Sequence, residues 1–279
     1  MKPAPAEQAE REYNLRAAFP DHPQWFARWA ADSAAARQSL AASLNLRYGS
    51  GPKQTIDLFP SPHPRGALLF IHGGYWRALD KSEHSFIAPP LVASGIGVAV
   101  INYDLCPQVG IGHIVAQCRE GVAWLLREGP RYGVPAARLV VAGHSAGAHL
   151  AAMLLATDWE ALGLPGAVAG AAAVSGIFDL EPLLQVSFNA ELKLDAAAAR
   201  ALSPVHLRPP RAAPLLLAAG AEETRAFIAQ SWLLWECWPE CRPAGRDAPL
   251  FIAARHHFSV LCDLGDPHSA LAGALRCLF

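Results

Sequence analysis

The pentapeptide Gly143-His144-Ser145-Ala146-Gly147 constrains the fold of this chain more than any other feature. It follows an apolar run at residues 139–142 and precedes a stretch of helical composition. Glycines flank the serine because a strand-to-helix turn this sharp has no room for larger side chains. Such a turn lifts the hydroxyl above a sheet, at a helix N-terminus whose dipole favours negative charge. The pattern predicts a nucleophile elbow with Ser145 as the nucleophile.

Apolar runs alternate with helical stretches through the rest of the chain. Strands are expected at 54–59, 67–72, 98–103, 138–142, 168–175, 214–219 and 250–254. Helices are expected at 82–94, 111–132, 146–157, 224–238 and 269–278. Short, wholly apolar strands between helices predict an α/β protein with a mostly parallel sheet, covered by helices on both faces. At 279 residues the chain is expected to form one domain, residues 1–279.

Two segments stand apart from this alternation. Residues 1–48 are expected to form an N-terminal helical segment, with a break at residues 20–23 that contain two prolines. Its aromatic residues either anchor the segment on the main body, which we favour, or roof a binding pocket; they are Tyr13, Phe19, Trp25, Phe26 and Trp29. Residues 180–210 are expected to form an irregular helical insertion and are a candidate lid.

Composition excludes several classes of function. Hydrophobic residues make up 52% of the chain and charged residues 17%, which is typical of a well-buried globular protein. A net charge of −1 gives no attraction to nucleic acid or to anionic membranes. The charged N-terminus has no signal-peptide pattern, and no apolar run reaches the roughly 18 residues of a membrane span. We expect a cytoplasmic protein with a small-molecule substrate, no nucleic-acid or membrane partner, and a homodimer as its candidate assembly.

The six cysteines are scattered, and most lie in apolar surroundings. Cys237 and Cys241 are four residues apart, but their neighbours do not complete a metal-binding pattern. We therefore expect no metal and no other cofactor.

A second glycine motif, His72-Gly73-Gly74-Tyr75-Trp76, directly follows an apolar strand. Such a glycine pair leaves backbone N–H groups free to face a substrate oxygen. The N–H groups of Gly73, Gly74 and Ala146 are predicted to form an oxyanion hole. His72 is expected to hold the loop by hydrogen bonds, because a catalytic histidine here would break the chain order of the fold.

That chain order places an acid and then a histidine after the serine. Glu222 and Glu223 both follow the strand at 215–219, so either could orient an imidazole; Asp179 comes one strand too early. His256 and His257 follow the last strand, and adjacent residues on an extended segment point in opposite directions. Only one of them can act as the general base, and we favour His257.

These motifs, with the run Gly-His-Ser-Ala-Gly-Ala-His-Leu at 143–150, resemble the arylformamidases, also called kynurenine formamidases. These are serine hydrolases of the α/β-hydrolase fold, related to hormone-sensitive-lipase-type esterases. The resemblance extends over most of the chain. It implies Glu223 as the acid, where animal members commonly have Asp, and His257 as the base. It also implies hydrolysis of N-formyl-L-kynurenine to L-kynurenine and formate, a step of tryptophan catabolism, without a cofactor.

Two other functions remain open. A carboxylesterase acting on small acyl or aryl esters would use the same residues, since the motifs report reaction type better than substrate. A non-catalytic binding protein on this scaffold would be expected to lack a triad member or an oxyanion glycine, and all are present. Near the predicted site, Tyr75 and Phe178 are candidates to stack on an aryl substrate, whereas Trp76 is expected to pack beneath the loop.

Overall fold

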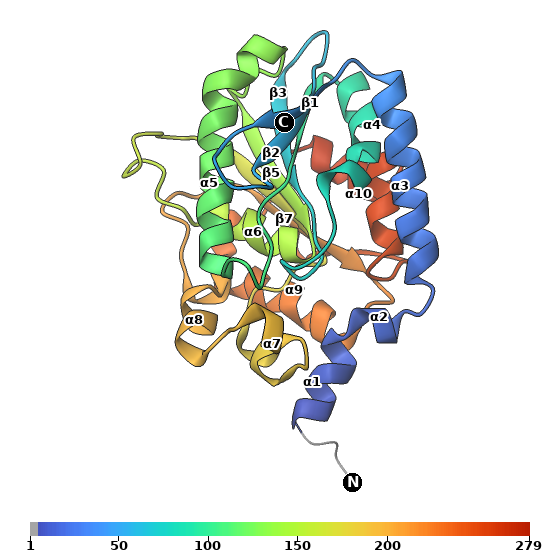
Figure 1. Cartoon of the computed structure of the whole chain (residues 1–279), viewed down its shortest axis with the longest axis vertical. Helices are drawn as coiled ribbons and strands as arrows, with labels where there is room; N and C mark the ends of the chain where they lie inside the picture. Colours follow the sequence, from blue (N-terminus) through green and yellow to red (C-terminus); the bar gives the residue numbers. More distant parts are fainter. Residues whose placement is uncertain (1–4) are drawn as a thin grey trace.

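The computed structural model describes residues 5–279 and contains one eight-stranded sheet (Figure 1). Its strands are β1 (Ser43–Arg47), β2 (Thr55–Phe59), β3 (Gly66–Ile71), β4 (Ile96–Ile101), β5 (Leu139–His144), β6 (Gly170–Val174), β7 (Leu215–Gly220) and β8 (Leu250–Ile252). Their spatial order is β1-β2-β4-β3-β5-β6-β7-β8. Strand β2 is antiparallel to both neighbours, and the other pairs are parallel. The predicted fold class, an α/β-hydrolase sheet, is confirmed.

Helices cover both faces of this sheet. The α-helices are α1 (Pro5–Tyr13), α2 (Leu15–Ala18), α3 (His22–Ser39), α4 (Ala88–Ala93), α5 (Ile111–Glu128), α6 (Ala146–Leu155), α7 (Asn189–Leu192), α8 (Ala196–Ala201), α9 (Arg225–Cys237) and α10 (Ala270–Arg276). Short 3₁₀ turns are η1 (Lys81–Glu83), η2 (Ser85–Ile87), η3 (Gly129–Tyr132), η4 (Glu181–Gln185), η5 (Pro204–His206), η6 (Pro239–Cys241) and η7 (Ser259–Gly265). In Figure 1, α5 lies on one side of the sheet and α3, α4 and α10 on the other, while α1, α7 and α8 gather at one end.

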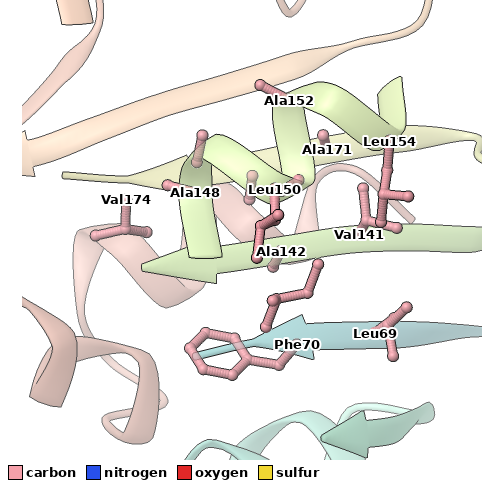
Figure 2. Close-up of a cluster of buried hydrophobic side chains, with 14 of the residues drawn as sticks. Leu69, Phe70, Val141, Ala142, Ala148, Leu150, Ala152, Leu154, Ala171 and Val174 are labelled. Atoms are coloured by element: carbon pink, nitrogen blue, oxygen red, sulfur yellow. The ribbon is translucent and has the colours of Figure 1, made fainter. Parts of the chain in front are cut away.

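The core is built around β3, β5 and α6, which are buried along their whole lengths. Figure 2 shows Leu150 and Leu154 of α6 beside Ala142 and Val141 of β5. Strand β6 has the sequence Gly-Ala-Ala-Ala-Val, so its small side chains let α6 approach the sheet closely. This packing holds the first turn of α6, where Ser145 lies, against the carboxyl end of the sheet.

The N-terminal segment differs from its prediction at one end. Helices α1 to α3 and the break near residue 20 agree with expectation, and residues 1–4 lie outside the described part. Residues 43–47, predicted as the end of a helical segment reaching residue 48, instead form the edge strand β1. Leu44 and Leu46 alternate with polar residues as a strand requires, but Asn45 has φ 57° and interrupts the register. A five-residue strand completed only by pairing with β2 carries too little local signal to be distinguished from a helix end.

Residues 180–210 fold into η4, α7, α8 and η5, joined by short turns. Among residues 5–279, no helix has the length and apolar character needed to cross a membrane. In the same range, His, Cys, Asp and Glu side chains nowhere form a cluster of three or more that could hold a metal ion.

Candidate active site

Ser145 occupies a strained turn between β5 and α6, with φ 57° and ψ −119°. A Cβ at position 147 would lie 2.0 Å from the carbonyl oxygen of Ile71, and one at position 143 would lie 2.1 Å from that of Gly147. Both contacts are with backbone atoms that cannot move aside, so only glycine fits at either position. The Ser145 N–H donates to the Val174 carbonyl at 2.9 Å, which ties the turn to β6. The steric reason for the pentapeptide is therefore visible in the fold.

Glu223 and His257 form a buried pair, with 2.9 Å between Oε2 and Nδ1. Their side chains are 0% and 2% exposed. The carboxylate also accepts from the Gly220 N–H at 3.2 Å and from the Ser175 hydroxyl, which compensates its burial. Because an ionised carboxylate can only accept, Nδ1 of His257 is assigned as the donor, and Nε2 is left with a lone pair. The loop after β7 thus orients this imidazole, as a general base requires.

The alternative residues point elsewhere. Glu222 is exposed. The side chain of Asp179 accepts from the Glu181 N–H at 3.0 Å and forms a local turn. His256 has its Nε2 3.1 Å from Asp21 and stacks on Phe19 with 4.6 Å between ring centres. His256 therefore holds the N-terminal segment, while its neighbour faces the elbow.

Ser145 and His257 line one cavity with an empty volume of about 770 Å³, including its open mouth. The remaining lining comes from three further segments, from the elbow and from the loop after β8: Asn14, Leu15, Arg16, Phe26 and Trp29; Gly74, Tyr75, Arg77, Ala78 and Leu79; Ser187 and Phe188; His144; and Phe258.

The glycine loop lies beside the elbow. Gly74 has φ +99°, and a Cβ there would lie 2.3 Å from the Ala78 carbonyl oxygen. A Cβ on Gly73 would lie 2.8 Å from the His144 carbonyl oxygen. Within residues 5–279, the backbone N–H groups of Gly73, Gly74 and Ala146 have no hydrogen-bond acceptor. These are donors that an oxyanion could satisfy.

Two buried side chains support this loop from below. The Tyr103 hydroxyl donates to the His72 carbonyl at 2.8 Å, and His72 Nδ1 lies 2.8 Å from the Gly73 carbonyl. Burial lowers the pKa of His72 to about 4, so this imidazole is neutral at physiological pH. Trp76 is fully buried and meets His149 edge-on at 5.0 Å, so it is scaffold, as predicted.

The two predicted aryl-binding residues have different environments. Tyr75 lines the cavity, its ring centre lies 4.5 Å from that of Phe188, and its hydroxyl donates to the Tyr13 carbonyl at 2.6 Å. Phe178 is 0% exposed and does not line the cavity. Its ring fills the space that a Cβ on Gly176 would occupy, so it belongs to the core. The prediction that Phe178 contacts substrate is wrong, because the turn after β6 directs this side chain inward.

Sequence reasoning missed most of the cavity wall. Both interpretations of the N-terminal aromatics hold, for different residues: Tyr13 is buried against Phe227, whereas Phe26 and Trp29 line the cavity. The density of aromatic residues in this segment was the available signal. Nothing in the sequence pointed to Phe188.

His144, the second residue of the pentapeptide, was also overlooked. Its Nε2 lies 2.8 Å from the His257 carbonyl oxygen, and the two rings are 4.7 Å apart. Burial holds the pKa of His144 well below its ordinary value, so the imidazole is neutral and donates from Nε2. The elbow thus steadies the backbone of the candidate base directly.

Comparisons with known proteins support a hydrolase. A family model described as BD-FAE matches residues 60–172. The kynurenine formamidase of Salmo salar is 37% identical over 177 residues, which cover 62% of this chain and 59% of the salmon protein. That of Danio rerio is 36% identical over 172 residues, covering 61% and 57%. The matched part thus spans less than two thirds of either relative.

Solved structures resemble the chain over nearly its whole length. A Silicibacter sp. protein, provisionally described as a thioesterase, is 36% identical with a TM-score of 0.84, covering 96% of this chain and 98% of its own. Esterase B of Lactobacillus rhamnosis is 18% identical with a TM-score of 0.68, covering 95% of both chains. At that identity, the second likeness concerns the fold alone.

Proposed function

The chain belongs to the α/β-hydrolases and is similar within them to the kynurenine formamidases, and on this premise we propose that it hydrolyses aryl formamides, with N-formyl-L-kynurenine as the leading substrate. One observation carries the proposal: Ser145 on its strained turn and His257, held by Glu223, line the same cavity. The relatives in sequence add the substrate class.

In the first half of the reaction, Nε2 of His257 takes the proton of the Ser145 hydroxyl, and Oγ attacks the formyl carbon. The carbonyl oxygen becomes an oxyanion and accepts from the N–H groups of Gly73 or Gly74 and of Ala146. Glu223 remains ionised and stabilises the imidazolium. Its hydrogen bonds from Gly220 and Ser175 keep it fixed during this step.

In the second half, His257 donates its proton to the aniline nitrogen, and the C–N bond of the tetrahedral intermediate breaks. Kynurenine leaves, and the formyl group remains as an ester on Ser145. A water molecule then gives its proton to His257 and attacks this ester. Collapse releases formate and returns the proton to Ser145.

The cavity wall suits such a substrate. A formyl group is the smallest acyl group, so the elbow needs no acyl pocket beyond the oxyanion donors. The aryl ring requires flat apolar surfaces, which Phe26, Trp29 and Phe188 provide. An aryl formamide is also a comparatively reactive amide, because the nitrogen lone pair is shared with the ring.

The direct test is formate release from N-formyl-L-kynurenine, compared with hydrolysis of p-nitrophenyl acetate by the same preparation. A formamidase has a kcat/KM for the formamide at least ten times that for the acetate, and Ser145→Ala loses both activities. Failure to release formate above the Ser145→Ala background would overturn the formamide assignment.

A specific observation favours one second candidate, hydrolysis of esters or thioesters. The Silicibacter sp. protein, which is 36% identical and covers 96% of this chain, is provisionally described as a thioesterase. The same residues would act, with an alkoxide or thiolate leaving in place of the aniline. A kcat/KM for p-nitrophenyl acetate equal to or above that for the formamide would favour this assignment.

A further inference from the structure

The charged side chains that line the cavity are of one sign. Arg16 and Arg77 belong to the lining, and within residues 5–279 no aspartate or glutamate does. His144, also in the lining, is neutral because burial lowers its pKa. A cavity with arginines and no carboxylates in its wall favours a ligand that carries an anionic group.

Arg77 already has partners within the protein. Its Nη1 lies 2.5 Å from Oε1 of Glu191, and its guanidinium lies 5.2 Å above the ring of Phe188. These contacts join the glycine loop to the insertion at 180–210 and neutralise the positive charge. Arg77 therefore serves the structure of the wall more than the recognition of an anion.

Two carboxylates of the N-terminal segment are bound to other groups as well. Glu10 accepts from Asn14 Nδ2 at 2.8 Å and from the N–H and hydroxyl of Ser187 at 2.8 and 2.9 Å. Asp21 accepts from Trp25 Nε1 at 2.9 Å and lies 3.1 Å from His256. Both acids are thus bound to other groups.

Arg16 is the cation that remains. It is exposed, and within residues 5–279 no carboxylate lies at ion-pair distance from it. Its guanidinium lies over the ring of Phe26, 5.7 Å from the ring centre. Because Phe26 also lines the cavity, this contact holds the guanidinium at the mouth with its donors available.

We propose that Arg16 binds a carboxylate on the leaving group of the substrate and makes the enzyme selective for aryl formamides or aryl esters that carry this carboxylate. This inference rests on the proposed function, and it adds the residue that reads the charge of the substrate. A planar guanidinium matches a carboxylate with two parallel hydrogen bonds, which a lysine at this position could not supply. The contact is remote from the bond that breaks, so it contributes to binding more than to the chemical step.

The experiment compares N-formyl-L-kynurenine with its methyl ester, a pair that differs in the charge of one group. Formate release reports cleavage of the formamide in both. Arg16→Gln lowers kcat/KM for the acid by about tenfold, mainly through a higher KM, and leaves the methyl ester within about twofold. Raising the salt concentration reduces the wild-type preference for the acid, because the contact is exposed.

Arg11→Gln is the matched control. Arg11 is exposed on α1, carries the same charge, and does not line the cavity. The Arg11→Gln variant is expected to have unchanged kcat/KM for both the acid and the methyl ester. Equal losses on acid and ester in Arg16→Gln, or no loss on either, would overturn the role of Arg16.

A failure of the proposed function gives a different experimental result from a failure of the Arg16 proposal. If the wild type releases no formate from either compound, the formamidase assignment fails, and the same charge comparison is made with 4-acetoxybenzoate and its methyl ester by acetate release. Calorimetry on Ser145→Ala separates binding from turnover: L-kynurenine binds about tenfold more weakly when Arg16→Gln is added. If the wild type is a formamidase, equal binding of L-kynurenine and its methyl ester to Ser145→Ala would overturn the Arg16 proposal. If it hydrolyses the acetate esters instead, equal losses on 4-acetoxybenzoate and its methyl ester in Arg16→Gln would overturn it.

Discussion

The floor of the cavity and its mouth are built from different kinds of contact. The floor, formed by Gly74, Ser145 and His257, is held by strand ends, by backbone atoms at van der Waals limits and by a buried carboxylate. The mouth, formed by Arg16, Phe26, Arg77 and Ser187, consists of side chains from three distant segments. These are joined mainly by polar contacts that water reaches, such as Arg77–Glu191 and Ser187–Glu10.

This difference separates chemistry from selectivity. A displacement of about 1 Å on the floor can cost roughly a hundredfold in rate, because the reacting groups need one geometry. Exposed contacts at the mouth each contribute about 1 kcal/mol or less to the free energy of unfolding. Substitutions there therefore shift substrate preference without disrupting the fold. The floor should therefore respond to substitution through kcat, and the mouth through KM.

The largest effect is expected for Ser145→Ala, which removes the proposed nucleophile from the floor. Turnover falls by about a thousandfold or more, since no other group can form the covalent intermediate. The thermal melt changes little, because alanine and serine bear similar strain at φ 57° and the backbone contacts remain. Steady-state kinetics measure the loss of turnover, and a thermal melt measures the stability of the variant. Appreciable residual activity would contradict the nucleophile assignment.

The adjacent histidines provide the next comparison. His257→Ala lowers kcat by about a hundredfold or more, because it removes the proposed general base and leaves Glu223 buried without its partner. His256→Ala removes only the contacts with Asp21 and Phe19, and it changes kcat by less than about threefold while lowering the melting temperature slightly. A large kcat defect in His256→Ala with a normal His257→Ala would reverse the assignment.

Acid should weaken the structure beneath the floor before it affects the mouth. Burial lowers the pKa of His72 to about 4, of His84 to about 3 and of His149 to about 4. Below pH 6.5 the unfolded chain binds protons that the folded chain refuses, so stability is greatest above that pH and falls towards pH 4. Each histidine contributes up to about 1.4 kcal/mol per pH unit.

Urea titrations at pH 7 and pH 5 measure this loss of stability. His149→Gln keeps a donor for the Leu202 carbonyl, which His149 Nε2 meets at 2.7 Å, and it removes one titrating group. The pH dependence of this variant should be shallower than that of the wild type. Equal stability at pH 7 and pH 5 would show that these imidazoles are not held neutral.

The smallest effect is expected where floor and mouth meet. Tyr75→Phe removes the hydrogen bond to the Tyr13 carbonyl but keeps the ring against Phe188. We expect a severalfold rise in KM with kcat nearly unchanged, because helix α1 loses one anchor to the glycine loop. Tyr132→Phe, which alters a tyrosine stacked on Trp124 away from the cavity, is the control. A kcat loss as large as that of His257→Ala would place Tyr75 on the floor.

Different parts of this protein were predictable to different extents. The alternation of strands and helices and the glycine positions at 143, 147 and 74 follow from short-range rules, and the structure has a steric reason for each glycine. The edge strand β1 was missed because a short strand acquires its identity from its partner. Phe178 was misplaced because its position after β6 does not reveal which way the ring turns.

Sequence alone determined the kind of turn that carries Ser145. At positions 143 and 147 any side chain would clash with nearby backbone atoms, so only glycine fits. It also determined that the sheet is mostly parallel and covered by helices, since wholly apolar strands must be buried on both faces. Only the tertiary structure decided that Glu223 rather than Glu222 meets His257, that His256 turns to Asp21, and that Arg16 and Phe188 share a cavity. The physical reason is that these relations depend on packing between segments far apart in the chain, whereas local rules extend over only a few residues.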